Sequence, residues 1–294
     1  MSNKIKKLNH NKGFTANLVT GIFVILFAII ASCTSHKKET IMVSGSTTVL
    51  PVVSRAAEQF ELRHPNVNIM VNAGGSGVGI NLLGEQNIQI GMISRNITQK
   101  EIEKYPDVHF VTHPIGRDAV VPVISSEIYD AGVRALTIDQ IAKIYKGEVK
   151  NWKEFGGPDK EILAVDKEMS RGTRHVFMGI VLGNEEAEAP GADLVLGSNN
   201  EEQTAIAQSD AAIGMLSNAW INNDVKGLSI ILANGEIVEP TLENIINGKF
   251  PITRNLLLIT NGEPQGIIKE FINFVKSPQG QKIVEQAGYV SLYQ

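Results

Sequence analysis

The stretch that decides the fold is Ile41–Thr48, IMVSGSTT, a short apolar run followed by a loop of small and hydroxyl residues. The segment behind it has apolar residues at Val49, Val53, Ala56 and Phe60, which is the spacing of one helix face. Strand, small polar loop and helix in this order form the repeating unit of parallel α/β sheets. The stretch therefore predicts an α/β protein with a polar loop at the sheet edge.

The same order recurs along the chain. Val67–Val71 is followed by NAGGSG and a helix predicted around 78–83, and Ile88–Ile93 is followed by SRN and a helix predicted over 99–104. Further strands are predicted at 108–111, 119–124, 162–166, 211–216 and 252–260, and further helices at 137–147, 173–181 and 267–276. Pro122 lacks an N–H, which indicates an edge or crossing position for its strand. The pattern predicts two α/β lobes, the first from residues 41–117 and 250–294 and the second from 118–249.

The N-terminus carries the pattern of a secretion signal. Four lysines precede the apolar run Leu18–Ala31, whose 14 residues would span about 21 Å as a helix, short of the roughly 30 Å hydrocarbon core. We therefore interpret residues 1–32 as a signal peptide and 33–40 as a tether. The sequence Ile30-Ala-Ser-Cys33 resembles a bacterial lipobox, which predicts a lipid on Cys33, the only cysteine. A buried free thiol, or a signal cut elsewhere, is the alternative.

Four loops share one design, namely small or hydroxyl residues between a predicted strand and a predicted helix. They are SGSTT (44–48), GGSG (74–77), SR (94–95) and SRGT (170–173). The first turn of a helix has free N–H groups and a partial positive charge, so it binds oxyanions without a metal. Each loop alone is typical of an ordinary helix cap. Four of them together, two with an arginine after a serine, favour an anion site.

Composition and motifs argue against several other classes. The formal charge is −4, and removing residues 1–32 takes away four lysines and no acid, leaving −8, so a nucleic-acid partner is not expected. The sequence has no GKS or GKT, with which a P-loop would end. The glycines of GGSGVG do not have the offsets of the dinucleotide-binding motif GxGxxG. GGSGV does not match the GxSxG motif of serine hydrolases. The histidines (10, 36, 64, 109, 113 and 175) lack metal-site spacing, so we expect neither a metal nor a cofactor, and structural or surface roles for His113 and His175.

An ordered set of motifs resembles the phosphate-binding subunit of bacterial phosphate ABC transporters. The set is SGSTTV, GGSGVGI, IGMISR, HPIGRDAV, SRGTR, AIGMLS and the tail from PITRNLLLITNG to QKIVEQAGYV. The resemblance implies a type II-like, two-lobed periplasmic-binding-protein fold that closes about a hinge on one phosphate. It implies these ligands: Ser46, Thr47, Thr48, Gly75, Ser76, Gly77, Ser94, Arg95, Ser170, Arg171, Gly172 and Thr173.

The resemblance also implies a monomeric, non-enzymatic receptor that delivers phosphate to permease subunits. Its location would be the outer face of the cytoplasmic membrane, through a lipid anchor such as palmitate on Cys33, or the periplasm. The alternatives are another tetrahedral oxyanion, such as sulfate or molybdate, an enzyme acting on phosphoryl groups, and a surface adhesin or sensor.

The chain departs from the family pattern at two places. Lys167 stands where an arginine is common and Ser-Arg replaces Gly-Ser in the SRGT loop, so Arg171 is expected to supply the guanidinium. Some relatives have an aspartate at the end of the third strand that accepts the phosphate proton, whereas this chain has Ser94. Asp118, in HPIGRDAV, is then the candidate acceptor. Its alternative role is an ion pair with Arg117 or a cap at the hinge.

Overall fold

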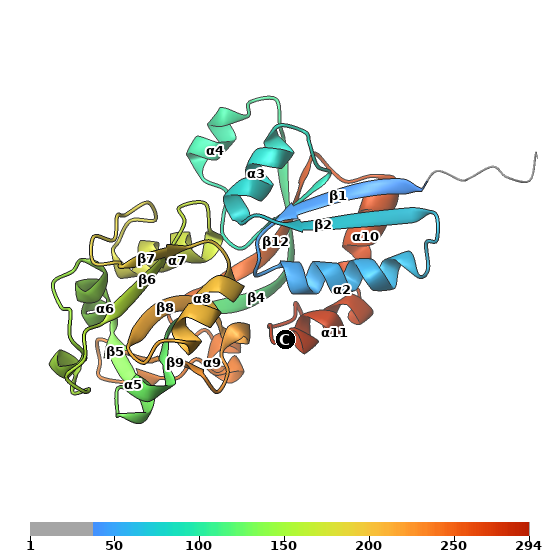
Figure 1. Cartoon of the computed structure of the whole chain (residues 1–294). Coiled ribbons are helices and arrows are strands. Elements are labelled where there is room, and N and C mark those ends of the chain that lie inside the picture. The colour runs from blue at the N-terminus through green and yellow to red at the C-terminus, as the bar shows by residue number, and fades with distance from the viewer. Residues whose placement is uncertain (1–37, 294) are drawn as a thin grey trace, which may run out of the picture. The chain divides into compact units, whose positions relative to one another are not determined.

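The computed structural model describes residues 38–293, which form a mixed α/β fold (Figure 1). The predicted signal peptide and Cys33 lie outside the described residues. The last two residues of the predicted tether belong instead to the first strand, β1 (Glu39–Gly45). No helix among residues 38–293 is long and apolar enough to cross a membrane.

Within the described residues one sheet of nine strands runs through the fold, in the order β2-β1-β3-β12-β4-β8-β6-β7 with β9 beside β4. Its other strands are β2 (Val67–Ala73), β3 (Ile90–Ile93), β4 (Phe110–Ser125), β6 (Leu163–Lys167), β7 (Leu194–Leu196), β8 (Ala212–Ser217), β9 (Val225–Gly227) and β12 (Thr253–Asn261). A three-stranded sheet holds β5 (Ala135–Thr137), β10 (Ser229–Ile231) and β11 (Ile237–Val238).

The helices cover the sheet and start at the polar loops. They are α2 (Leu50–Glu61), α3 (Ser76–Gly84), α4 (Gln99–Lys104), α5 (Ser126–Asp130), α6 (Ile138–Tyr145), α7 (Gly172–Val181), α8 (Asn199–Ala207), α9 (Leu242–Ile246), α10 (Gly266–Lys276) and α11 (Pro278–Gln286), with short 3-10 turns η1 (Trp152–Phe155) and η2 (Asn218–Trp220). The strand–loop–helix units predicted for β1–α2, β2–α3, β3–α4 and β6–α7 are thus present.

Strand β4 joins the two parts of the sheet. The sequence predicted separate strands at 108–111 and 119–124, but the chain forms one strand from Phe110 to Ser125. On one side β4 pairs with β12 as far as Ala119 and then with β9 from Val123 onward. Pro122 lies in the interval between these two partners, in agreement with a crossing position.

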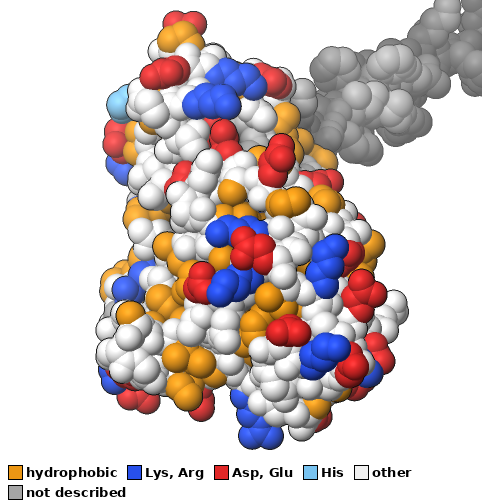
Figure 2. Space-filling model, turned by 90° about the vertical axis from the view of Figure 1, so that its left-hand side faces the viewer, with side chains coloured by type: hydrophobic (Ala, Val, Ile, Leu, Met, Phe, Trp, Pro, Cys, Tyr) orange, Lys and Arg blue, Asp and Glu red, His pale blue; other side chains and the backbone are white. Residues whose placement is uncertain are grey.

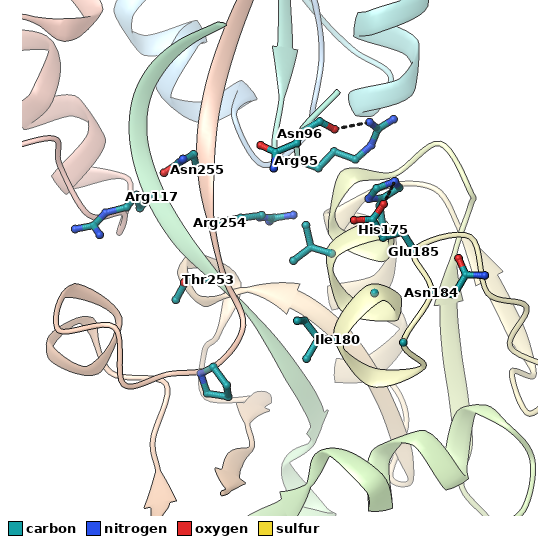
Figure 3. A pocket seen from close by; sticks show the side chains of 14 residues that line it. Arg95, Asn96, Arg117, His175, Ile180, Asn184, Glu185, Thr253, Arg254 and Asn255 are labelled. Atoms are coloured by element: carbon teal, nitrogen blue, oxygen red, sulfur yellow. Dashed lines mark hydrogen bonds and ion pairs between the residues drawn. The ribbon is translucent and has the colours of Figure 1, made fainter. Parts of the chain in front are cut away.

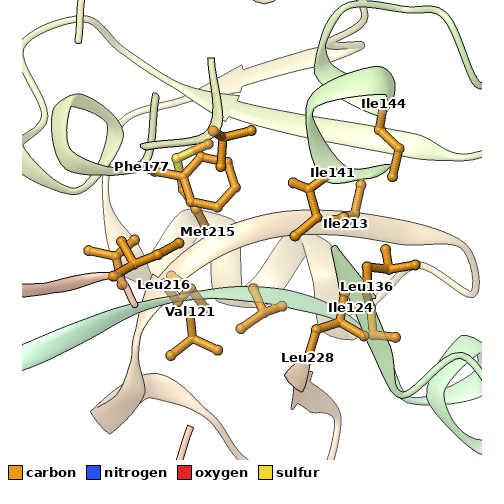
Figure 4. Packing of buried hydrophobic residues seen from close by; sticks show 14 of the residues in the cluster. Val121, Ile124, Leu136, Ile141, Ile144, Phe177, Ile213, Met215, Leu216 and Leu228 are labelled. Carbon is orange, nitrogen blue, oxygen red and sulfur yellow. The ribbon is translucent and has the colours of Figure 1, made fainter. Parts of the chain in front are cut away.

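Two hydrophobic cores lie on the two parts of the sheet. The first packs β1, β3 and β12 against α2, α10 and α11 on one face and against α3 on the other, because alternate strand residues face opposite sides. The second packs β4, β6 and β8 against α6 and α7 and includes Tyr145 and Phe177, whose ring centroids are 5.3 Å apart (Figure 4). We call the elements around these cores lobe 1 and lobe 2.

The lobe boundaries predicted from the sequence remain a proposal. Phe250, Ile252 and Val290, which that proposal assigns to lobe 1, pack in the core of lobe 2. The C-terminal segment therefore contributes to both cores, while α10 and α11 pack on lobe 1.

Four buried charges fix the end of β6, from which the SRGT loop departs. Arg174 donates two hydrogen bonds to Asp166, at 3.1 and 3.0 Å, and both side chains are buried. Lys167 forms an ion pair with Glu202 of α8, and both are buried. Glu202 also accepts a hydrogen bond from the Met215 backbone N–H of β8, at 2.7 Å. The pair thus ties β6, α8 and β8 together next to the loop.

Burial acts against the charges of the Lys167–Glu202 pair. Burial lowers the pKa of Lys167 and raises the pKa of Glu202, although each partner's charge opposes the shift in the other. Removing one partner from a buried pair is strongly destabilising, because the remaining charge has no compensation. The position of the SRGT loop therefore depends on both residues.

We expect Lys167→Met to lower the free energy of unfolding by about 3–5 kcal/mol at neutral pH. In this variant the folded-state pKa of Glu202 lies above its unfolded value, so stability falls as the pH rises through that folded-state pKa. The loss relative to wild type should be smaller at pH 5 than at pH 8 in urea unfolding. The double variant Lys167→Met, Glu202→Met should recover most of the lost free energy of unfolding.

The exposed pair Lys143–Asp139, at 2.9 Å, provides the control, since Lys143→Met should change stability little at either pH. A Lys167→Met loss that does not depend on pH, or a double variant no more stable than the single one, would contradict the assignment.

Candidate functional site

Four hydroxyls from three lobe 1 loops form one buried cluster. Ser46 Oγ donates to Ser94 Oγ at 2.9 Å, and the Ser94 N–H donates to Ser76 Oγ at 3.0 Å. The Thr48 N–H donates to Ser46 Oγ at 3.2 Å. Each of these four side chains is at most 3% exposed. The loops after β1, β2 and β3 therefore converge as predicted, because parallel strands bring their carboxyl ends to one edge.

The SRGT loop of lobe 2 meets this cluster. Thr173 Oγ1 lies 3.4 Å from Thr48 Oγ1, and the Ser170 carbonyl accepts a hydrogen bond from the Gly77 N–H at 2.9 Å. A β-carbon at Gly172 would overlap the hydroxyls of Ser76 and Ser94, so only glycine allows this approach. The backbone at the start of α7 thus lies against the lobe 1 hydroxyls.

Among the helices that begin at the cluster, α3 and α7 have no capping side chain, and neither has α2, which follows Thr48. Within residues 38–293, no side chain caps the N-terminus of α3, whose N-cap is Gly75 with φ +94°, or that of α7, whose N-cap is Arg171. By contrast, α4, α6 and α8 each have a complete capping box. The Gly77 N–H at the start of α3 is already bonded to the Ser170 carbonyl, so the Ser76 N–H and the first N–H groups of α7 are the ones left for an oxyanion, which the partial positive charge of a helix N-terminus attracts.

A buried arginine that the sequence analysis missed lies beside the hydroxyls. Arg254, on β12, donates from Nε to Asp118 Oδ1 at 2.8 Å and from Nη2 to Asp118 Oδ2 at 2.9 Å. Its Nη1 donates to Thr173 Oγ1 at 3.1 Å. The partner of Asp118 is therefore Arg254, not Arg117. Arg254 was detectable, because an arginine that alternates in phase with Leu256 and Leu258 in an apolar strand must be buried and paired.

A second missed residue is Asn199, the first residue of α8. Its Nδ2 donates to Thr48 Oγ1 at 3.1 Å, and the side chain is buried. The sequence signal was a further strand–loop–helix unit, LVLGSNNEE, which is hard to recognise because β7 has three residues. Together with Thr173, Asn199 brings a lobe 2 side chain to the Thr48 hydroxyl of lobe 1.

The two arginines predicted as ligands each have a carboxylate partner. Arg95 donates to Glu101 at 2.8 and 2.6 Å and to the Asn96 carbonyl at 2.8 Å. Burial acts to raise the pKa of Glu101, but the bonds from Arg95 and Thr98 keep it below its usual value. Arg171 lies over Gly75 and donates to Glu168 at 2.9 Å from Nε. Thr47 is half-buried. The roles of these residues toward a ligand remain predictions.

A cleft of about 840 Å³ adjoins the cluster. Arg254 points into it from β12, with Ile180, His175 and Glu185 on the opposite wall, while the Arg95 guanidinium turns toward the Asn96 carbonyl (Figure 3). Burial and the charge of Arg95 lower the pKa of His175, against the effect of Glu185. No metal-binding group of His, Cys, Asp and Glu exists within residues 38–293.

The distribution of charge on one face of the molecule is mixed. On the face in Figure 2, lysine and arginine side chains alternate with aspartate and glutamate and form no continuous basic area.

Comparison with known proteins identifies the family of the chain. The family model described as "PBP superfamily domain" matches residues 32–279. The chain is 36% identical to the phosphate-binding protein PstS of Bacillus subtilis over 250 residues, covering 84% of this chain and 79% of that one. It is 30% identical to PstS of Borreliella burgdorferi, covering 92% and 97% of the two chains.

A solved structure shows the same fold. It is a phosphate ABC transporter substrate-binding protein from Clostridium perfringens with bound phosphate, with a TM-score of 0.77 and 31% identity, covering 86% of this chain and 100% of that one. Because the family model spans most of the chain and the two PstS relatives share 36% and 30% identity with it over most of both chains, the chain belongs to the PBP superfamily and, within it, to the PstS family of phosphate ABC transporter substrate-binding proteins.

Proposed function

We propose that this chain captures inorganic phosphate outside the cytoplasm and delivers it to the permease of an ABC transporter. The observation that carries the proposal is the buried group of hydroxyls between the lobes, with two uncapped helix N-termini and Arg254 directed at it. Phosphate offers acceptors to all of these donors. The PstS relatives and the phosphate-bound neighbour support the same ligand.

The ligands we propose follow from these contacts. Hydroxyls come from Ser46, Thr48, Ser76, Ser94 and Thr173, backbone N–H groups from Ser76 and from Gly172 and Thr173 at the start of α7, and the cation from Arg254. Hydrogen bonds to a charged group contribute about 1.5–3 kcal/mol each. Six of them gross roughly 9–18 kcal/mol on that scale, against an association cost of about 4–15 kcal/mol. Micromolar or tighter binding is within that range.

The chain is proposed to act by binding and not by catalysis. In the described residues, the buried carboxylates Asp118, Asp166 and Glu202 are each paired with Arg254, Arg174 and Lys167, respectively, so none is placed as a free general base. The hydroxyls of the cluster bond to each other and have no histidine partner. We further propose that the protein is a monomer.

Arg254→Met should weaken phosphate binding by about 1.5–3 kcal/mol, roughly 10- to 150-fold, because it removes the arginine that is bonded to the Thr173 hydroxyl beside the cluster. Titration calorimetry measures the effect. Arg171→Ala and Arg95→Ala serve as matched controls, since each guanidinium has a carboxylate partner, and should cost less than Arg254→Met. If Arg171→Ala or Arg95→Ala weakened phosphate binding more than Arg254→Met does, that arginine would be the main cationic ligand, as the sequence predicts.

Asp118→Asn tests selectivity. The Asp118 carboxylate orients Arg254 and can repel a fully deprotonated anion. The amide that replaces it would hold Arg254 less firmly and would repel such an anion less. We expect weaker phosphate binding and a smaller preference over sulfate, measured by calorimetry with both anions and with molybdate. An Asn variant with wild-type phosphate affinity and unchanged rejection of sulfate would leave serine hydroxyls or backbone carbonyls as the acceptors of the phosphate proton.

Membrane attachment is proposed to depend on a lipid at Cys33. Cys33→Ser should abolish metabolic palmitate labelling and move the protein from the detergent phase to the aqueous phase. Ser32→Ala, which keeps a small residue before the cysteine, is the control and should retain both. Unchanged labelling and partitioning of Cys33→Ser would show that the anchor lies elsewhere.

A further inference from the structure

The C-terminal segment, residues 288–292, follows α11 and contacts both lobes. The Gly288 carbonyl accepts a hydrogen bond from Asn218 Nδ2 at 2.9 Å, and Asn218 begins η2 directly after β8 of lobe 2. At the other end of the segment, the Leu292 N–H donates to Gln281 Oε1 of α11 at 2.7 Å, and α11 packs on lobe 1. The C-terminal segment therefore links the two lobes in addition to β4.

The same segment is fixed to β4 near the point where this strand changes partners. Arg117 and Val290 exchange two backbone hydrogen bonds, each of 2.9 Å. The Ala119 N–H donates to Asn218 Oδ1 at 3.0 Å, so the side chain that holds the segment also holds β4. Because Asn218 and Arg117 hold the segment on either side of Tyr289, the backbone that carries this tyrosine is fixed.

Tyr289 extends from this backbone to the SGSTT loop of lobe 1. Its hydroxyl donates to the Thr48 carbonyl at 2.8 Å, and the side chain is buried. Burial, followed by the charge of Asp118, raises the pKa of Tyr289, so the hydroxyl keeps its proton at neutral pH and acts as a donor. A buried carbonyl that loses its donor costs free energy, so the bond holds the Thr48 backbone in place.

Thr48 is the residue at which the hydroxyl cluster of lobe 1 meets lobe 2 and the buried arginine. Its Oγ1 lies 3.4 Å from Thr173 Oγ1. The same oxygen accepts hydrogen bonds from Asn199 Nδ2 at 3.1 Å and from Arg254 Nη2 at 3.4 Å. A small rotation of Thr48 would therefore change the distance of its hydroxyl to all three of these side chains.

The direction of the Thr48 hydroxyl is set by bonds on both sides of the residue. The Thr48 N–H donates to Ser46 Oγ at 3.2 Å, and the Thr48 carbonyl accepts from Tyr289. Because the two peptide groups flank the same Cα, fixing both of them fixes the direction of the Cα–Cβ bond. Removing the Tyr289 hydroxyl releases the carbonyl side of Thr48 while the N–H side stays held.

We propose that Tyr289 is a positioning residue for anion binding. Its hydroxyl holds Thr48 so that the Thr48 hydroxyl meets the ligand together with Thr173 and Arg254. The C-terminal segment thus takes part in binding without touching the ligand, since it acts through Thr48. This inference rests on the proposed phosphate site and adds to it a residue outside the four loops.

The test is a double-mutant cycle, measured by titration calorimetry of phosphate-free protein with inorganic phosphate. Tyr289→Phe removes the hydroxyl alone and should weaken binding about three- to tenfold, the range of one neutral hydrogen bond. Thr48→Val lacks the hydroxyl that Tyr289 positions. Adding Tyr289→Phe to Thr48→Val should therefore change the affinity by less than about twofold, because the two residues act as a unit.

Tyr145→Phe is the matched control. Tyr145 is also buried, and its hydroxyl also donates to a backbone carbonyl, that of Val165, at 3.0 Å. Both tyrosine variants should lose a similar part of the free energy of unfolding in urea. Tyr145→Phe should nevertheless bind phosphate within about twofold of wild type, which separates a loss of stability from a loss of positioning.

The outcomes separate the two proposals. If Tyr289→Phe binds phosphate as wild type does, loses as much affinity in the Thr48→Val background, or loses no more than Tyr145→Phe, the positioning role is overturned and the phosphate site stands. If wild type binds sulfate or molybdate but not phosphate, phosphate capture is overturned, and the same cycle with the anion that binds decides the role of Tyr289. Binding of none of these three anions overturns both proposals.

Discussion

The buried ion pair between Arg254 and Asp118 is the contact on which the site depends. It joins β12 to β4 at the point where β4 changes partners, and both oxygens of the carboxylate are used. This leaves Arg254 Nη1 directed at Thr173 of lobe 2. Because a bidentate guanidinium–carboxylate pair fixes direction as well as distance, the charge is held in place before a ligand arrives.

Around this fixed cation the chain supplies neutral donors instead of further free charges. Hydroxyls and uncapped helix N-termini are short-range donors, so they act on an anion that has entered and attract little from a distance. This suits a protein with a formal charge of −4, and a mixed-charge surface on the face in Figure 2. Both lobes contribute, since Ser76 belongs to lobe 1 and Thr173 to lobe 2, so binding one anion would hold the lobes together.

Much of this arrangement could be predicted from the sequence, because it follows from local rules. Strand, polar loop and helix appear in order along the chain, and parallel strands bring such loops to one edge, so Ser46, Ser76 and Ser94 were found correctly to lie together. Long-range pairing was less accessible. The resemblance implied Arg95 as a ligand, and in the structure its guanidinium is bonded to Glu101, a nearby partner that the loop pattern did not indicate.

Arg254 was missed because its partner Asp118 is 136 residues away in the sequence, so no local pattern joins the two. The continuity of β4 was also missed, because the turn-like HPIG sequence interrupts its apolar pattern, whereas the strand pairs with β12 both before and after a register shift in this stretch. Local pattern thus identified the neutral donors of the candidate site, and tertiary pairing decided which arginine stands beside them.

A crystal structure of the protein grown with inorganic phosphate tests the central claim most directly. The account predicts one phosphate between the lobes, within hydrogen-bonding distance of the Ser76 and Thr173 hydroxyls and of the Arg254 guanidinium. Phosphate bound instead at Arg171, or a cluster whose hydroxyls still bond only to each other with phosphate elsewhere, would contradict it.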